Sequence, residues 1–597
     1  MNLFVLTVEL AALAVCWALV GWSLLSRDVR GALDPLLRWT TALALGAGVT
    51  ALSLTALAAL HLFGHQAIRL FTILEAAAAL TVALIKRREL RAEIGARVDD
   101  RTRVWGAAVL VLGVILLATF IATCAPPSAM DATVYHLYAP AEFLRTGTWT
   151  KLDEVQSFQP LYVEMLFAQG LAIGGGPLAA LVHWLLGVGA IGAAACWARR
   201  FGARGLWAAV MFGGSALWVW ESTSAFIDLA LGLFASLSLL FAVSSELGGA
   251  AVCLAGVFGG LAGGTKFTGV VLAALSGGVA FARSWPDRKV AFRSLLVVGT
   301  IALLVASPWY IRDALLTGNP FFPLANKVFG LPPQPLASMT YGLGTDLLHL
   351  LSSPFDLLAR GENFDQGWAL GPAYLAFAPV GWVLLRSRRS HEAALVGAYA
   401  LAWWLIWFYS SPQTRLLVPM LPMLAGLGAV AIDALLASRR ALRLVTVCIL
   451  GVELTGGLAA AALYLRTAGP VVLGKESADS YLRRTSWNYV AYKLTEKLLP
   501  ADARIAVTGS ANNLYYFDRP AHWLGKLPVS TARLAAAGFE YELRVLPCPL
   551  EPLDDPRRMV VSEGDFPLPA SRAAGGIYAQ ACYRLSTVSP ASAGASH

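Results

Sequence analysis

The sequence predicts a polytopic α-helical membrane protein with about 14 transmembrane helices and a small exported α/β domain at its C-terminus. Three observations lead to this prediction. Of the 597 residues, 57% are hydrophobic and 14% are charged, and the mean hydropathy is +0.62. Apolar runs of about 20 residues, the length that crosses a bilayer, recur as far as residue 464. Residues 465–597 contain no such run. This composition excludes a soluble globular protein of this size.

Each apolar segment is expected to be helical, because lipid cannot satisfy an unpaired backbone. The first segment follows no basic residue and carries Glu9, so we expect a retained span rather than a cleaved signal peptide. The predicted spans are 3–25, 36–62, 66–85, 104–124, 177–197, 205–220, 227–246, 249–263, 267–284, 292–308, 370–387, 393–409, 415–437 and 441–464.

The distribution of Lys and Arg predicts the orientation of these spans. Six loops assigned to the cytoplasm hold 23 Lys and Arg residues, and the short loops assigned to the outside hold seven. Both termini are therefore predicted to be extracytoplasmic. The net charge of +9 reflects the cytoplasmic loops, so we infer no nucleic-acid partner. Usage rich in Ala, Arg and Gly and poor in Lys favours a bacterial inner (plasma) membrane. The cytoplasmic loops are 27–38, 86–103, 199–204, 283–293, 386–389 and 438–443.

Three domains follow from this pattern. We expect a three-helix N-terminal extension at 1–86, a membrane module at 87–464 with external loops 125–176 and 309–369, and an extracytoplasmic α/β domain at 465–597. Strand-like segments in the last domain are ARIAVTG (503–509) and IYAQACYRL (577–585). Cys548 and Cys582 are the only cysteines in this domain. In an oxidising compartment they could form a disulfide that contributes about 3–4 kcal/mol.

The segment from Pro126 to Trp149 directly follows a predicted span and carries the first candidate site. Asp131 allows two interpretations. Ser128-Ala-Met-Asp131 matches a capping box, in which the carboxylate only satisfies amides at a helix start. Alternatively, Asp131 is a general base that accepts a proton from an acceptor hydroxyl. Five polar residues at offsets of 0, 4, 7, 11 and 14 would share one helix face: Asp131, Tyr135, Tyr138, Glu142 and Arg145.

Three cations favour the second interpretation. Lys266, Arg312 and Arg415 each lie at the predicted outer end of a span, where the positive-inside tendency disfavours basic residues. A charged side chain near hydrocarbon usually faces a cavity or a partner. Arg and Lys are common phosphate ligands, so we predict that the three cations bind a shared phosphate.

Further polar residues at outer span ends are candidates for substrate contacts. His136 is also a weak candidate for a metal ligand, although a single histidine in an aromatic segment is more often structural. The sequence has no Walker loop, GxSxG or HExxH motif, so no cofactor is expected except, as an open alternative, a divalent metal. The substrate-contact candidates are Tyr135, His136, Tyr138, Glu142, Gln159, Glu164, Glu221, Asp228, Tyr310, Asn319 and Arg360.

With these residues in place, the chain resembles the GT-C superfamily of integral-membrane glycosyltransferases, in its protein O-mannosyltransferase and aminoarabinose-transferase branch. The resemblance covers about residues 104–464 and rests on the order of its motifs, while the tail resembles the exported domain of many members. After Asp131 the motifs are EFLRTGTW, QPLYVEMLFAQGLAIGGGP, WARRFGARG, GLAGGTKFTG, SPWYIRDALLTGNPFFP and TRLLVPMLP.

The resemblance implies an inverting glycosyltransferase that uses a polyprenyl-phosphate-linked sugar at the extracytoplasmic face. Asp131 would deprotonate the acceptor hydroxyl of a lipid, glycan or protein, and Lys266, Arg312 and Arg415 would hold the donor phosphate. Two features depart from the family. Many relatives have a second acidic residue after the first, where this chain has Ala132, and three additional spans precede the module.

Three alternatives stay open at this point. A transporter or flippase for a lipid-linked glycan would also need apolar spans and phosphate-binding cations. An O-antigen polymerase or ligase shares the donor but usually carries its key loop late in the chain, and loop 309–369 contains Arg360, Glu362 and Asp365. A non-catalytic membrane scaffold is the third alternative.

Overall fold

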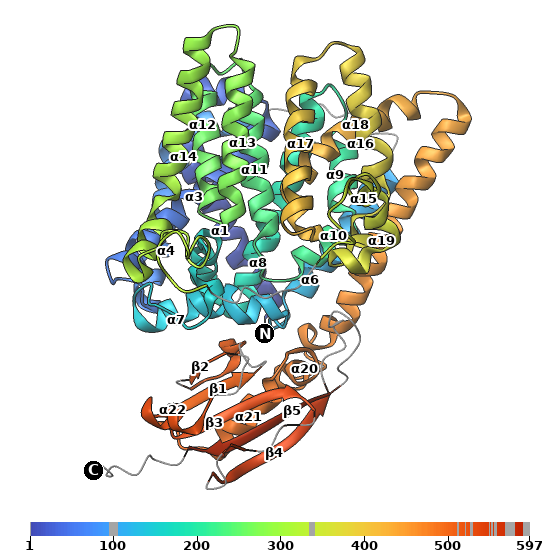
Figure 1. Ribbon diagram of the computed structural model, residues 1–597. Coiled ribbons are helices and arrows are strands. Elements are labelled where there is room, and N and C mark those ends of the chain that lie inside the picture. Colours follow the sequence, from blue (N-terminus) through green and yellow to red (C-terminus); the bar gives the residue numbers. More distant parts are fainter. Residues whose placement is uncertain are drawn as a thin grey trace.

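The structure, a computed structural model, is a long helical bundle with a small sheet domain packed at one end (Figure 1). It describes residues 2–94, 106–333, 341–509, 513–519, 521–525, 529–548, 550, 553–554, 558–567 and 580–588. Within these residues, nine helical segments are long and apolar enough to cross a membrane: α1 (Leu3–Leu24), α3 (Pro35–Ala59), α4 (His65–Ile85), α6 (Gly106–Thr123), α8 (Tyr162–Arg200), α14 (Arg288–Thr317), α17 (His391–Ser410), Thr414–Leu436 and α19 (Arg440–Val472).

The other five predicted spans fall on shorter helices. Four are single apolar helices, and the fifth, 205–220, divides into two pieces at Gly214. All 14 predicted segments are thus helical, which confirms the mainly helical membrane fold. The shorter helices are α9 (Gly205–Gly213), α10 (Ala216–Ser222), α11 (Asp228–Val243), α12 (Gly249–Gly263), α13 (Phe267–Arg283) and α16 (Ala373–Ser387).

Helix α8 reverses direction in its first half. Gly175 has φ 72° and ψ −163°, a backbone conformation open mainly to glycine, and Pro177 follows it. A Cβ on Gly170 would lie 2.7 Å from the Cα of Ala179, so the segments before and after the break pack against each other. The segment 162–174 is therefore a separate arm beside the predicted span 177–197.

The first three long helices pack into the same bundle. Helices α1 and α3 approach closely, because a Cβ on Gly21 would lie 1.9 Å from the carbonyl oxygen of Ala42, and one on Gly46 would lie 1.8 Å from that of Trp17. Helix α4 reaches the arm of α8, where the Gln169 amide donates to a buried carboxylate of α4 at 2.9 Å. The N-terminal extension thus contacts the part of the bundle that follows Asp131.

Short helices connect these elements on both ends of the bundle. They are α2 (Arg27–Ala32), α5 (Arg87–Ile94), the π-helix η2 (Ala132–His136), α7 (Tyr138–Thr146), η3 (Val155–Phe158), α15 (Leu347–Ala359), η4 (Gly361–Phe364), η5 (Gly367–Leu370) and η6 (Thr414–Met420), which leads into α18 (Leu421–Leu436).

The C-terminal domain is a five-stranded mixed sheet in the order β2-β1-β3-β5-β4. Strand β1 pairs in parallel with β2 and β3, and β5 pairs antiparallel with β3 and β4. Strands β1 and β5 correspond to the two predicted strands, and a disulfide joins Cys548 to Cys582. The elements are α20 (Ala478–Thr485), α21 (Tyr489–Leu498), β1 (Ile505–Gly509), η7 (Leu514–Tyr516), β2 (Ala521–Trp523), α22 (Thr531–Ala536), β3 (Tyr541–Pro547), β4 (Val560–Pro567) and β5 (Gln580–Thr587).

This domain contacts the bundle next to the predicted catalytic segment. The hydroxyl of Tyr516 in η7 donates to the carbonyl oxygen of Pro127 at 2.6 Å. His522 pairs with Asp153 across the same boundary at 3.0 Å. Tyr138 packs against the apolar cores of both parts. The sheet domain therefore supports the loop from which Asp131 projects.

Candidate functional site

The segment around Asp131 forms a π-helix rather than the uninterrupted α-helix that the spacing predicts. The amide of Leu137 donates to the carbonyl of Ala132, five residues earlier, at 2.8 Å. This wider turn displaces the residues that follow it from the expected helix face. The face predicted from Asp131 to Arg145 is therefore divided: Asp131 meets the membrane helices, whereas Tyr138, after the turn, contacts both the bundle and the C-terminal domain.

The Asp131 carboxylate makes no capping hydrogen bond to the backbone of this helix. Instead its Oδ2 accepts from Nη1 of Arg415 at 2.6 Å, 284 residues away in the chain. Burial alone would raise the pKa of Asp131, but the charge and hydrogen bond of Arg415 outweigh it and hold the pKa below its ordinary value. Asp131 is therefore an ionised carboxylate aimed at a cation, which the capping interpretation does not explain.

Arg415 is held from two sides at the start of η6. Its Nε donates to the side-chain oxygen of Gln413 at 3.1 Å and lies 3.8 Å from Oδ2 of Asp365. Asp365 comes from the loop between α15 and α16 and has a left-handed backbone, with φ 56°. Burial raises the pKa of Asp365, and Arg415 opposes this effect. One guanidinium thus joins carboxylates from two external loops.

A second ion pair lies beside the first. Lys266 follows the Gly263-Gly264 end of α12, and its Nζ lies 2.8 Å from Oδ1 of Asp228, the first residue of α11. The Asp228 side chain is 2% exposed and that of Lys266 is 15% exposed. The charge of Lys266 also lowers the pKa of Asp131, which places the two pairs in one electrostatic cluster.

Glu221 is the least satisfied member of this cluster. It is fully buried near the end of α10, and neither of its carboxylate oxygens has a hydrogen-bond partner among the described residues. It lies within the electrostatic influence of Asp228, Arg415 and Lys266. A buried carboxylate without partners is costly, so this group is suited to receive a hydrogen-bond donor from a bound molecule.

His136 and Glu164 form a buried pair behind Asp131. Nδ1 of His136 lies 2.7 Å from Oε1 of Glu164 on the α8 arm, and the other oxygen of Glu164 has no described partner. The Tyr135 ring lies against the His136 ring with centroids 4.0 Å apart. No group of three His, Cys, Asp or Glu residues within the described chain is arranged to hold a metal. The pair links the Asp131 segment to the arm.

Arg312 differs from the phosphate ligand expected from the sequence. It is 1% exposed, and its guanidinium donates to the carbonyl oxygens of Trp149, Thr150 and Ser157 at 3.0–3.4 Å. It also pairs with the adjacent Asp313 at 3.0 Å. Four of its five N–H donors thus go to protein groups, which hold loop 149–158 against α14. Lys266 and Arg415 are the two members of the predicted set whose side chains lie in the Asp131 cluster.

Most of the remaining candidates have structural partners. Glu142 pairs with Arg145 on the surface at 2.6 Å, and Arg360 lies 3.7 Å from Asp356 with its side chain 59% exposed. The Tyr310 hydroxyl donates to the carbonyl of Gly263 at 2.8 Å. The Asn319 amide donates to the carbonyl of Leu324 and to the side-chain oxygen of Asn326. Gln159 is half-buried at the end of η3.

Two further residues belong to the surroundings of Arg415: Asp365, which pairs with it, and Tyr341, which lies within the electrostatic influence of Asp365, Arg415 and Asp131. In the sequence, Asp365 is only one of the polar residues of loop 309–369 that keep an O-antigen polymerase or ligase open. Its position beside Arg415 depends on the packing of η4 and η5. Tyr341, in the same loop, has its pKa raised by burial and by Asp365, and the charges of Asp131 and Arg415 also act on it. The available signal was the concentration of polar residues in loop 309–369.

Comparison with known proteins identifies the fold. The sequence matches no protein-family profile and no curated protein. The structure is similar to the crystal structure of ArnT from Cupriavidus metallidurans in the apo state, with a TM-score of 0.52 and 17% identity over 82% of this chain and 99% of that chain. It is also similar to the same protein bound to undecaprenyl phosphate, with a TM-score of 0.51 and 16% identity over 83% and 100% of the two chains. The chain therefore has an ArnT-like fold, as expected from the resemblance to the GT-C superfamily.

Proposed function

We propose that this multi-pass membrane protein is an inverting glycosyltransferase that moves a sugar from a polyprenyl-phosphate donor to an acceptor hydroxyl. The observation that carries the proposal is the Asp131–Arg415 pair beside the Lys266–Asp228 pair, at the end of the bundle where the C-terminal domain packs. The ArnT-like fold supports it, because ArnT has been crystallised with undecaprenyl phosphate.

The charges of the site suit a phosphodiester. In the structure, Arg415 and Lys266 are balanced by Asp131, Asp365 and Asp228. A donor phosphate would compete for both cations, with its isoprenoid chain between membrane helices. When Arg415 turns towards phosphate, Asp131 loses the interaction that lowers its pKa and becomes a stronger base. Donor binding would thus prepare Asp131 for proton transfer.

The transfer then proceeds as a single displacement. Asp131 accepts the proton of the acceptor hydroxyl as its oxygen attacks the anomeric carbon from the face opposite the phosphate. The bond between the anomeric carbon and the phosphate oxygen breaks, and polyprenyl phosphate departs with the electron pair and one additional negative charge. Lys266 and Arg415 stabilise this charge. Glu221, which has no hydrogen-bond partner among the described residues, accepts a hydrogen bond from a hydroxyl of the sugar or acceptor.

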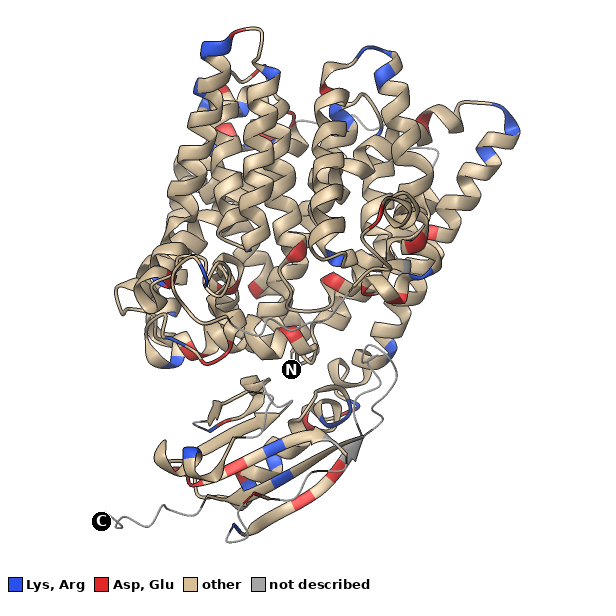
Figure 2. Ribbon diagram, viewed as in Figure 1, with Lys and Arg blue, Asp and Glu red and all other residues tan. Residues whose placement is uncertain are grey.

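The charge distribution supports extracytoplasmic chemistry. Lys and Arg gather at the loops on the end of the bundle opposite the sheet domain (Figure 2). The positive-inside rule favours a cytoplasmic location for that end, so we propose that both termini, the sheet domain and Asp131 are extracytoplasmic. Nucleotide sugars are not available on that side, so a lipid-linked donor is required. We propose the bacterial inner membrane as the location.

An enzyme of the O-antigen polymerase or ligase type is the second candidate. The observation in its favour is Asp365, because loop 309–369 delivers this carboxylate to within 3.8 Å of Arg415. Both candidates share the donor chemistry and differ in the acceptor. Identification of the product separates them, since a polymerase extends a glycan by a repeat unit. Movement of the lipid-linked glycan without a new glycosidic bond would instead favour a flippase.

Mass spectrometry of co-purifying lipids tests the phosphate site. The wild type, a Lys266→Ala/Arg415→Ala variant and a matched Lys151→Ala/Lys327→Ala variant are purified under identical conditions. The control removes two exposed cations from the external loops, neither of which is a site candidate. We expect a polyprenyl-phosphate sugar with the wild type and control and none with the site variant. If all three carry only bulk phospholipid, the phosphate role of the two cations is refuted.

The isolated lipid then tests the base. We expect the wild type to convert it to polyprenyl phosphate in the presence of membrane acceptors. Asp131→Asn should retain the lipid and lose about 10²–10⁴-fold in rate, the usual contribution of a positioned acid or base. A variant that transfers at the wild-type rate would contradict the assignment of Asp131.

A further inference from the structure

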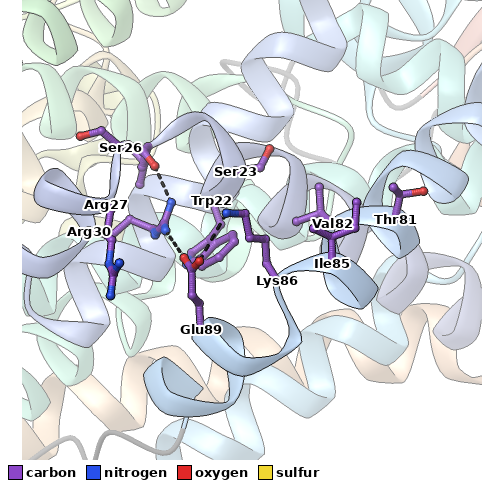
Figure 3. Close-up of a pocket in the computed structure, with 11 residues that line it drawn as sticks. Trp22, Ser23, Ser26, Arg27, Arg30, Thr81, Val82, Ile85, Lys86 and Glu89 are labelled. Atoms are coloured by element: carbon purple, nitrogen blue, oxygen red, sulfur yellow. Dashed lines mark hydrogen bonds and ion pairs between the residues drawn. The ribbon is translucent and has the colours of Figure 1, made fainter.

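A cavity separate from the proposed site opens at the other end of α1 and α4. It has a volume of about 450 Å³ and lies between the α1–α2 junction and the α4–α5 junction (Figure 3). Both junctions are within loops that the charge pattern assigns to the cytoplasmic side. Its wall combines cations, hydroxyls and apolar side chains: Trp22, Ser23, Leu25, Ser26, Arg27, Arg30, Thr81, Val82, Ile85, Lys86 and Glu89.

Arg30 and Trp22 form a rigid floor for this cavity. The Arg30 guanidinium lies 3.9 Å from the centroid of the Trp22 ring and is buried. It donates to the carbonyl of Leu25 at 2.6 Å and to Glu89 at 2.7 Å, and its Nε lies 3.4 Å from Glu93. The Trp22 indole donates to the same Glu93 at 2.7 Å. Each nitrogen of the Arg30 guanidinium therefore donates to a protein group, which fixes its position.

Two further cations remain available at the rim. Arg27 is exposed and forms no ion pair with the residues that the structure describes, and the Lys86 side chain is 49% exposed. Lys86 lies 3.3 Å from Glu89, which also pairs with Arg30, so Glu89 lies between the two cations in Figure 3. One carboxylate among three cations leaves the wall with a charge of about +2, counting each side chain at its ordinary ionisation near pH 7.

The cavity lies where the apolar surface of the helices ends. Leu80 and Leu84 on α4, Leu24 at the end of α1 and Ile85 at the rim are all exposed. In a membrane-spanning bundle these side chains face hydrocarbon. A ligand in the cavity would thus have its charged end against Arg27 and Lys86 and its apolar part against α1 and α4. A lipid has both parts, whereas a free phosphate ion would use only the first.

We propose that this cavity binds the headgroup phosphate of an anionic phospholipid, with the acyl chains lying along α1 and α4. Basic pockets between helices at the cytoplasmic boundary are suited to such headgroups, because the lipids of that leaflet carry negative charge. The inference does not depend on the proposed transferase activity. It gives the N-terminal helices a lipid-binding role of their own.

Native mass spectrometry of the full-length protein tests the site. The delipidated wild type is titrated with dioleoyl-phosphatidylglycerol and, separately, with dioleoyl-phosphatidylcholine. The site variant is Arg27→Ala/Lys86→Ala. The matched control is Arg439→Ala/Arg440→Ala, which removes two exposed cations from another loop assigned to the same side.

We expect one tight phosphatidylglycerol site in the wild type and control. The site variant should bind about 30-fold more weakly, because each cation near a membrane surface contributes about 1 kcal/mol to anionic-lipid binding. Equal binding by the site variant, or an equal loss in the control, would overturn the proposal. Equal affinity for phosphatidylcholine would overturn the assignment to anionic lipid.

Competition with inorganic phosphate separates the two sources of a phosphate group. Potassium phosphate at 10 mM is compared with potassium chloride at the same ionic strength. We expect phosphatidylglycerol to remain bound in both, because a free ion lacks the apolar contacts. If phosphate alone displaces the lipid, the cavity is a site for free phosphate and the lipid assignment is wrong.

Discussion

Replacing Lys266 by methionine should separate the structural from the chemical role of the Lys266–Asp228 pair. The Lys266 ammonium lies 2.8 Å from a carboxylate that is 2% exposed. At this distance the Coulomb attraction is about 6 kcal/mol at an effective dielectric constant of 20, and desolvation of the two charges offsets much of it. Methionine has a similar length but leaves Asp228 buried without a counter-charge. We expect a loss of about 3–5 kcal/mol in the free energy of unfolding.

A double-mutant cycle completes the test. Asp228→Asn added to Lys266→Met removes the uncompensated charge and should restore most of the stability. Glycosyl transfer should not return, because the donor phosphate still lacks its ammonium. Lys493→Met is the matched control, since Lys493 pairs with the exposed Asp518 and its loss should change the unfolding free energy by about 0–1 kcal/mol.

Stability is measured by equilibrium unfolding in mixed micelles followed by tryptophan fluorescence, and transfer by conversion of the lipid-linked donor. A loss below 1 kcal/mol for Lys266→Met would refute the view of this pair as a buried interaction. Wild-type transfer by the double variant would refute contact between Lys266 and the donor.

Three other perturbations test separate parts of the molecule. Arg415→Gln should raise the pKa of Asp131, so the acid limb of the pH–rate profile should move to higher pH. In the wild type the folded-state pKa of Asp131 lies below its ordinary value, so Asp131 stabilises the fold above that ordinary value and this contribution is lost as the pH falls through the folded-state pKa. Arg415→Gln should reduce this stabilisation. An unmoved acid limb would contradict this coupling. Tyr516→Phe removes one hydrogen bond between the sheet domain and the Asp131 loop and should cost about 0.5–1.5 kcal/mol by thermal or detergent unfolding, with a larger effect on the rate of transfer than on donor binding. Unchanged stability and rate would show that this contact is dispensable. Cys582→Ser opens a disulfide that spans 34 residues and should destabilise the C-terminal domain by about 4 kcal/mol, measured by limited proteolysis; wild-type resistance would be evidence against it.

The sequence was sufficient to predict the helical segments and two strands. All 14 predicted apolar segments are helical, because hydropathy and the need for internal backbone hydrogen bonds are local properties. Strands β1 and β5 were visible for a similar reason, since β-branched and aromatic residues gather within each short segment. Segment 205–220 is helical but forms two helices instead of one, because Gly214 and the cap residue Ser215 divide the continuous apolar run.

Local pattern could not determine which polar residues meet. Asp131 lies in a candidate capping box, but its carboxylate reaches Arg415 because the π-turn and the packing of η6 bring the two together. Arg312 has the same sequence signature as Arg415, a cation at the outer end of a span, yet its donors hold loop 149–158. Asp365 joins the site only through the course of an external loop.

The physical reason is the range of the interactions involved. Membrane insertion and helix formation depend on neighbours within a few turns, so the chain itself determined the helices, two of the five strands and the residue types available at the outer ends of the spans. An ion pair depends on atoms within about 4 Å, and the sequence separates Asp228 from Lys266 by 38 residues and Asp131 from Arg415 by 284. Only the packing of α8, α11 and η6 brought Asp131 and Asp228 together with Arg415 and Lys266, and left Glu221 without a hydrogen-bond partner among the residues that the structure describes.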